Sequence, residues 1–172
     1  MTKLSKAGHE ELERRLGNHY PTTVLGSGAL GIVYATKDPA VAVKISNDPS
    51  ERIFASYQKR KQLPGIVKVH NTFAIEGNDY IVRERVEIVE FDAEEKKWLY
   101  RAAMVGLDAI MNKDSAEWRE FLSDTVPARL KTMADTMRAH KNHIFADVKR
   151  ENVGMAIDGT IVLFDLGGIA LI

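Results

Sequence analysis

Short apolar runs separated by turn residues dominate the first half of the chain. Residues 22–46 alternate in character and predict a three-strand antiparallel meander. Apolar residues at helical spacing predict a helix over about 50–62, and two further strands are expected at 66–75 and 79–90. The first 90 residues therefore predict five strands and one helix.

The second half of the chain has a mainly helical pattern. Apolar and charged residues mix at helical spacing over about 94–111 and 115–124, and a further helix is expected after Pro127. Short strands then return at 153–157 and 160–164. Asp158-Gly159 between them is a strong signal for a hairpin turn.

One more helix is predicted at the start of the chain. Residues 5–16 are rich in charge, Ser5 is a suitable cap, and Gly17 can end the helix. We interpret this helix as a solvated N-terminal appendage, since charge-rich termini usually lie in solvent.

Composition excludes several classes of protein. The 172 residues include 24 basic and 24 acidic side chains, so no basic surplus favours nucleic acid binding. The absence of cysteine excludes disulfides, iron–sulfur clusters, thiolate zinc sites and a cysteine nucleophile. Neither a signal peptide nor an apolar run of membrane-spanning length is found, so no membrane partner and a cytoplasmic location are expected.

A glycine-rich stretch interrupts the first predicted strand pair. It reads Gly26-Ser27-Gly28-Ala29-Leu30-Gly31, and strand-forming residues follow it. Glycines between two strands allow a main chain to approach phosphate oxygens, whereas a dinucleotide-binding loop would lead into a helix. A plain hairpin with a bulge remains an equal alternative for this motif taken alone.

Lys44 ends the third predicted strand, 13 residues after Gly31. Lysine at such a place can pair with the α- and β-phosphates of a nucleotide, and Val33 and Ala42 can supply apolar surface beside an adenine ring. A solvated lysine at a sheet edge is the alternative.

The most specific pattern lies near the C-terminus. Asp147-x-Lys149-x-x-Asn152 is followed, 18 residues after Asp147, by Asp165-Leu166-Gly167. In this order and spacing the sequence resembles the protein kinase family. The resemblance implies that Asp147 orients the acceptor hydroxyl and that Lys149 stabilises the transferred phosphoryl group. It also implies that Asn152 and Asp165 hold Mg²⁺.

The resemblance implies an α+β fold of two lobes forming a single minimal kinase domain over 1–172. The expected parts are an N-terminal helix (1–20), an N-lobe (21–89) and a truncated C-lobe (90–172), with ATP and Mg²⁺ bound between the lobes. The chain is similar to minimal kinases of phages and bacterial effectors. The apolar residues 169–172 are expected to be an exposed tail.

Two departures from the family pattern stand out. Phe145-Ala146 replaces the usual His-Arg before the catalytic aspartate, which removes the cation that meets a phosphorylated activation loop. Glu51, the only glutamate of the 50–62 helix, lies about one turn early for pairing with Lys44. The sequence leaves open whether that pair forms.

The function implied by the resemblance is an ATP-dependent protein kinase that phosphorylates serine or threonine. Its partners would be ATP and a protein substrate, including host proteins in a host cytoplasm if the chain is a phage or bacterial effector. One alternative is a nucleotide-binding, pseudokinase-like module that inhibits or recruits a partner without turnover. Another is a small-molecule phosphotransferase.

Overall fold

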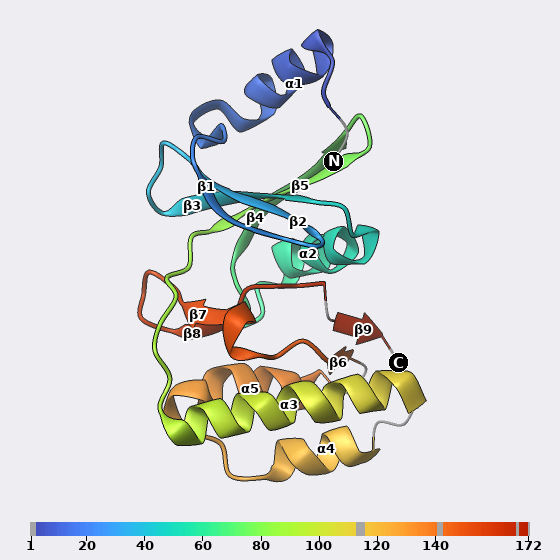
Figure 1. Cartoon of the computed structure of the whole chain (residues 1–172), viewed down its shortest axis with the longest axis vertical. Coiled ribbons are helices and arrows are strands. Elements are labelled where there is room, and N and C mark those ends of the chain that lie inside the picture. The colour runs from blue at the N-terminus through green and yellow to red at the C-terminus, as the bar shows by residue number, and fades with distance from the viewer. Residues whose placement is uncertain (1–2, 113–115, 141–142, 168, 172) are drawn as a thin grey trace. The chain divides into compact units, whose positions relative to one another are not determined.

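The computed structural model describes residues 3–112, 116–140, 143–167 and 169–171. The chain divides into two compact units, and each unit is made of two segments of the chain. Unit 1 comprises residues 1–62 and 68–85, and unit 2 comprises residues 63–67 and 86–172. The architecture is mixed, with a five-stranded antiparallel sheet in unit 1 and mainly helices in unit 2 (Figure 1).

The sheet of unit 1 has the order β1-β2-β3-β5-β4, with every neighbouring pair antiparallel. Its strands are β1 (Val24–Gly28), β2 (Gly31–Ala35), β3 (Val41–Ser46), β4 (Val69–Ile75) and β5 (Asn78–Glu84). The predicted five strands and the meander are confirmed.

The last two strands are shorter than predicted, because the residues beyond their ends pair within unit 2. Val67 donates its main-chain N–H to the carbonyl of Leu163, and Glu87 exchanges main-chain hydrogen bonds with Met155.

Helix α1 (Lys6–Leu16) covers one face of this sheet (Figure 1). Ser5 caps it as predicted, with its hydroxyl accepting the N–H of Gly8 at 3.1 Å. Leu12 and Leu16 are buried in one hydrophobic cluster with strand residues of the sheet: Val41, Val43, Phe73, Ile75, Tyr80 and Val82. The interpretation of this helix as a solvated appendage is therefore wrong, because Leu12 and Leu16, one turn apart, form an apolar stripe that meets the sheet.

Helix α2 (Pro49–Lys61) packs on the opposite face of the sheet (Figure 1). The side chain of Asp48 caps it by accepting the N–H of Ser50 at 2.9 Å, and Pro49 occupies the first helical position. The Ser56 and Thr72 hydroxyls lie 2.9 Å apart, joining the helix to β4.

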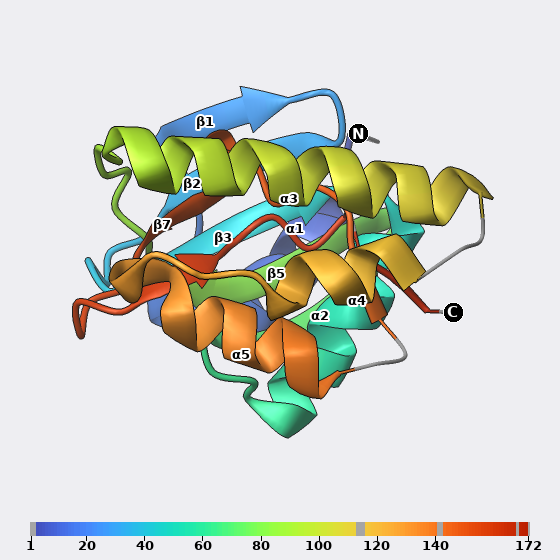
Figure 2. The ribbon, with the colours of Figure 1, turned by 90° about the horizontal axis from the view of Figure 1, so that it is seen from below.

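The helices of unit 2 are α3 (Ala93–Asn112), α4 (Ala116–Ser123) and α5 (Lys131–Ala139), with a 3₁₀ turn at Ala128–Leu130. Helices α4 and α5 lie on the same side of α3 (Figure 2). Phe121 contacts both tryptophans of the chain, with ring centroids 5.2 Å from Trp98 and 5.9 Å from Trp118. The helical predictions are confirmed; Ser115, where the second was expected to start, lies outside the described residues.

Two short antiparallel strand pairs complete unit 2. β7 (Val153–Met155) pairs with β8 (Ile161–Leu163) across the predicted Asp158-Gly159 turn, in which Gly159 has a φ of +85°. β6 (His143–Phe145) pairs with β9 (Ile169–Leu171). Residues 169–171 are thus part of a strand pair and not the free tail that was expected, while residue 172 lies outside the described residues.

None of the described helices combines the length and apolar character that a membrane-spanning segment needs.

The packing of α1 can be tested by its contribution to stability. We expect Leu16→Ala to lower the free energy of unfolding by about 2–4 kcal/mol, because the leucine is buried against the sheet. Glu13→Ala, an exposed change on the same helix, serves as the control and should have little effect. Urea unfolding measures both variants, and equal stability of the two would contradict the observed packing.

Candidate functional site

The glycine-rich stretch forms the β1–β2 hairpin of unit 1. Gly26 and Gly28 belong to β1, and only Ala29 and Leu30 make the turn. Residues 26–28 are exposed, and a Cβ added at either glycine would meet no atom within 4 Å. The main chain of Gly26, Ser27 and Gly28 is therefore open to the approach of a ligand.

Gly31 differs from the other two glycines. A Cβ at this position would lie 2.4 Å from the carbonyl oxygen of Ile45, so no larger residue fits between β2 and β3 here. Sheet packing therefore accounts for this glycine. The carbonyl of Leu30 accepts the N–H of Asn47 at 2.9 Å, which ties the hairpin turn to the end of β3.

Strand register places three predicted site residues on one face of the sheet. Val33 lies opposite Lys44, and Ala35 lies opposite Ala42. Directly paired residues share a face, as do residues two apart on one strand, so Val33, Ala42 and Lys44 all face the side on which α2 packs. Ala42 and Lys44 are buried, and Val33 is half-buried.

Lys44 pairs with Glu51. The Lys44 Nζ atom lies 2.7 Å from Glu51 Oε1, and the two side chains are only 7% and 1% exposed. The pair forms although Glu51 lies in the first turn of α2, because only Asn47 and Asp48 separate that helix from β3. The helix N-terminus also favours a carboxylate there.

Ser46 is a further member of this cluster that the sequence analysis did not identify. Its hydroxyl donates to Glu51 Oε2 at 2.6 Å and accepts the N–H of Asp48 at 3.1 Å. Both oxygens of the buried Glu51 carboxylate are thereby engaged. The available signal was the spacing, because Ser46 follows Lys44 by two residues and so shares its face of the strand.

In unit 2, Asp147 and Lys149 form an ion pair. The Lys149 Nζ atom lies 3.0 Å from Asp147 Oδ1, and both side chains are partly exposed. The hydrogen bond from Lys149 to Asp147, aided by the charges of Asp165 and Glu151, raises the pKa of the Lys149 ammonium. The lysine is therefore cationic at neutral pH.

Asn152 holds Asp147 from the other side. Its Nδ2 donates to Asp147 Oδ2 at 2.6 Å and to the Asp147 carbonyl at 3.0 Å. The buried amide is thus oriented with Oδ1 turned away from Asp147. Amide oxygens are ligands for hard cations, whereas the amide nitrogen is not.

Asp165 is joined to this loop through the main chain. Phe164, its neighbour, donates its N–H to the carbonyl of Asn152 at 2.8 Å. Asp165 Oδ1 in turn accepts the N–H of Gly167 at 3.3 Å. The four residues predicted for phosphoryl transfer, Asp147, Lys149, Asn152 and Asp165, therefore belong to one cluster within unit 2.

Buried neighbours fix the loop that carries Asp147. Phe145 and Val148 are fully buried on either side of it, an environment that suits large apolar side chains. Helix α3 approaches so closely at Gly106 that a Cβ there would lie 2.7 Å from the carbonyl oxygen of Phe145.

The donor set fits Mg²⁺ bound together with phosphate. Mg²⁺ commonly takes one or two protein oxygens and completes its shell with water and substrate phosphates. Asp165 and Asn152 offer a carboxylate and an oriented amide oxygen. No group of three or more His, Asp or Glu side chains able to hold a metal occurs in the described part of the chain, so an all-protein metal cage is not found there.

The Lys44–Glu51 pair gives a prediction about stability. Removing one partner leaves an uncompensated buried charge, so Lys44→Met or Glu51→Gln alone should each lower the free energy of unfolding by about 3–5 kcal/mol. The double variant Lys44→Met/Glu51→Gln should recover part of that loss. Chemical denaturation of all four proteins gives the coupling energy; additive losses would mean that the two groups do not interact.

Comparison with known proteins finds similarity to solved structures. No family model matches the sequence, and no curated protein matches it. The structure is similar to the crystal structure of the kinase domain of PknI from Mycobacterium tuberculosis, a cysteine-to-alanine mutant, with a TM-score of 0.46 and 18% sequence identity. The match covers 88% of this chain and 60% of that chain, so this chain spans less than two thirds of the PknI domain.

Proposed function

We propose that the chain is a protein kinase-like phosphotransferase that moves the γ-phosphate of ATP to a serine or threonine hydroxyl of a protein. The observation that supports this most is the cluster in unit 2, where Lys149 and Asn152 contact opposite oxygens of Asp147. Phosphoryl transfer needs positioning and charge neutralisation more than covalent chemistry, and these residues can supply both.

Asp147 would act on the acceptor. Each of its carboxylate oxygens already accepts one contact, and each can accept another, so a hydroxyl can bind without displacing Lys149 or Asn152. As the hydroxyl oxygen bonds to the γ-phosphorus, the bond from that phosphorus to the β–γ bridging oxygen breaks. The hydroxyl proton passes to Asp147, and ADP leaves with the bridging oxygen.

Lys149, together with Mg²⁺ held by Asn152 and Asp165, would neutralise the charge of the phosphates. The ammonium of Lys149, held cationic by its carboxylate neighbours, can stabilise the phosphoryl oxygens during transfer. Asn152 and Asp165 would hold Mg²⁺, which when bound neutralises phosphate charge.

Residues of unit 1 would bind the remainder of the nucleotide. Lys44, fixed by Glu51, would contact the α- and β-phosphates, and the open main chain of Gly26, Ser27 and Gly28 would donate N–H groups. Val33 and Ala42 share the face of Lys44 and would offer apolar surface to adenine. Gly31 would contribute by keeping β2 close to β3.

The finer parts of the proposal come from the resemblance of the sequence to minimal kinases. They are the choice of serine or threonine, action as a phage or bacterial effector, and host proteins in the host cytoplasm as substrates. The same resemblance implies a fold of two lobes, of which the second is truncated.

The proposal can be tested by radiolabel transfer from [γ-³²P]ATP to the chain itself and to mixed cell proteins. We expect Asp147→Asn to reduce transfer by about 100-fold or more, since the amide cannot take up the hydroxyl proton. Asp158→Asn is the control, because its side chain accepts the N–H of Thr160 in the β7–β8 turn, which asparagine can also do.

Binding measured on the same proteins separates the alternatives. Titration calorimetry should show Mg²⁺-dependent ATP binding by the wild type and by Asp147→Asn. Equal labelling by both proteins would overturn the catalytic role of Asp147. ATP binding by a wild type that transfers no phosphate would indicate a nucleotide-binding module instead.

A further inference from the structure

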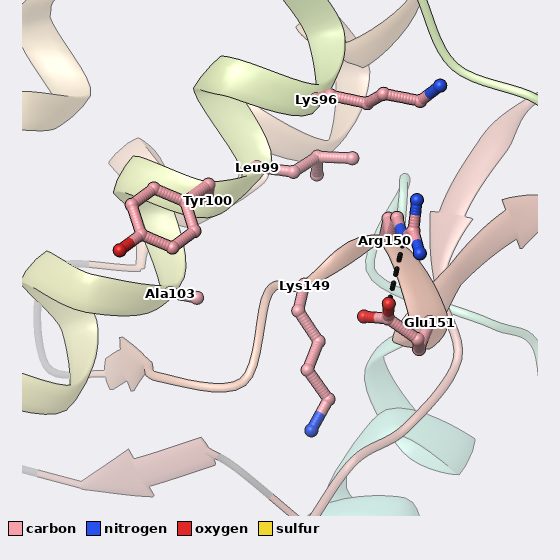
Figure 3. Close-up of a pocket in the computed structure, with 7 residues that line it drawn as sticks. All are labelled: Lys96, Leu99, Tyr100, Ala103, Lys149, Arg150 and Glu151. Carbon is pink, nitrogen blue, oxygen red and sulfur yellow. Dashed lines mark hydrogen bonds and ion pairs between the residues drawn. The ribbon is translucent and has the colours of Figure 1, made fainter.

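A shallow pocket of about 160 Å³ lies in unit 2, between α3 and the residues that follow Asp147 (Figure 3). Seven residues line it: Lys96, Leu99, Tyr100 and Ala103 from α3, and Lys149, Arg150 and Glu151 from the loop. Lys149 thus contributes to the pocket wall and also contacts Asp147. The pocket is therefore a neighbour of the carboxylate that would receive an acceptor hydroxyl.

The pocket combines an apolar wall with cations at its rim. Leu99, Tyr100 and Ala103 form the apolar part, while the ammonium of Lys149 points away from α3 in Figure 3. Lys96 and Arg150 provide the positive charges of the rim, and Glu151 provides a negative one. Their present partners are exposed: Lys96 lies 3.7 Å from Glu90, which is 98% exposed, and Arg150 lies 2.8 Å from Glu151. Such exposed pairs are weak, so an incoming carboxylate can compete for these cations at low cost.

An apolar stripe continues from the pocket along α3. Tyr100, Met104, Leu107 and Met111 follow one another at steps of four, three and four residues, so they share one face of the helix. Each of these side chains is between 47% and 67% exposed. Tyr100 belongs to both the pocket and the stripe. We call the pocket and stripe together the α3 surface.

We propose that the α3 surface docks the acceptor segment of the protein substrate, with an acidic side chain in the pocket and apolar side chains along the stripe. This inference rests on the proposed function, which places the acceptor hydroxyl at Asp147. Charge complementarity selects this occupant, because a carboxylate on an apolar stem matches both the rim and the wall of the pocket. An extended chain advances about 3.3 Å per residue, so an acidic residue a few positions from the acceptor can reach the pocket.

Peptide binding tests the inference without requiring turnover. Fluorescently labelled peptides would carry a central serine, an acidic, neutral or basic residue (Glu, Gln or Lys) at the flanking positions, and leucines beyond them. Anisotropy should show the Glu peptide binding most tightly to the wild type. Lys96→Glu should weaken its binding roughly threefold to fivefold, the size of one exposed ion pair, and should improve binding of the Lys peptide. Met104→Ser should weaken all three peptides alike.

Lys97→Glu is the matched control, because it makes the same charge change on an exposed residue of α3 that does not line the pocket. Circular dichroism would verify that each variant is folded. Equal affinity of the wild type for the three peptides, or an equal loss in Lys96→Glu and Lys97→Glu, would overturn the inference. A dimer in sedimentation equilibrium that Met104→Ser abolishes would assign the stripe to a second copy of the chain and also overturn it.

The radiolabel assay keeps this result separate from the proposed function. Phosphate transfer that is intact while the peptides show no preference would remove the docking surface and leave the phosphotransferase. Selective peptide binding by a protein that transfers no phosphate would have the opposite meaning: the surface recognises acidic segments, but they are not acceptors.

Discussion

The main-chain hydrogen bond from Phe164 to Asn152 sets the geometry of the cluster in unit 2. It continues the β7–β8 pairing by one step at the open end of that hairpin, beyond the Val153–Leu163 pair. This hydrogen bond places Phe164 beside Asn152. Asp165, the next residue along the chain, therefore lies close to Asn152. A slip of one residue would turn every side chain of the hairpin to the other face and separate these two residues. The Asp158-Gly159 turn, which fixes the register, therefore contributes to the site without touching it.

In unit 1 the main constraint is the burial of two charged side chains, Lys44 and Glu51. Lys44 and Glu51 are both nearly excluded from solvent, and a buried charge persists only where its partners are in place. Here the partners come from a strand and from the first turn of the next helix, joined by two residues. Ser46 and the helix N-terminus satisfy the second carboxylate oxygen and favour its charge. Because the connection between β3 and α2 is so short, the Lys44–Glu51 pair forms wherever these two elements are formed.

Local signals in the sequence predicted most of the elements, and tertiary contacts account for what it missed. Asp158-Gly159 and the alternation of residues 22–46 act over a few residues, and both predictions are confirmed. The burial of α1 could not be predicted from a charge-rich segment, because it depends on the apolar face that distant strands present to Leu12 and Leu16. Strand β9 depends in the same way on β6, some 25 residues earlier in the chain. Motif spacing predicted Lys44, Asp147 and Asp165 as candidates but did not identify Ser46. The Lys44–Glu51 contact and the packing role of Gly31 became visible only in the arrangement of β2, β3 and α2.

Lys149 connects two features of unit 2 that would otherwise be independent. Its ammonium forms an ion pair with Asp147, while its aliphatic stem forms part of the pocket beside α3. A carboxylate bound at Lys96 and Arg150 would favour the charged form of Lys149 further, since opposite charges nearby stabilise an ammonium. It would also repel Asp147 and Asp165 only weakly, because at this exposed rim water screens charges that are not in contact. Binding an acidic segment in the pocket is therefore electrostatically compatible with an anionic Asp147 and a cationic Lys149, the two states that the proposed transfer to a neighbouring hydroxyl requires.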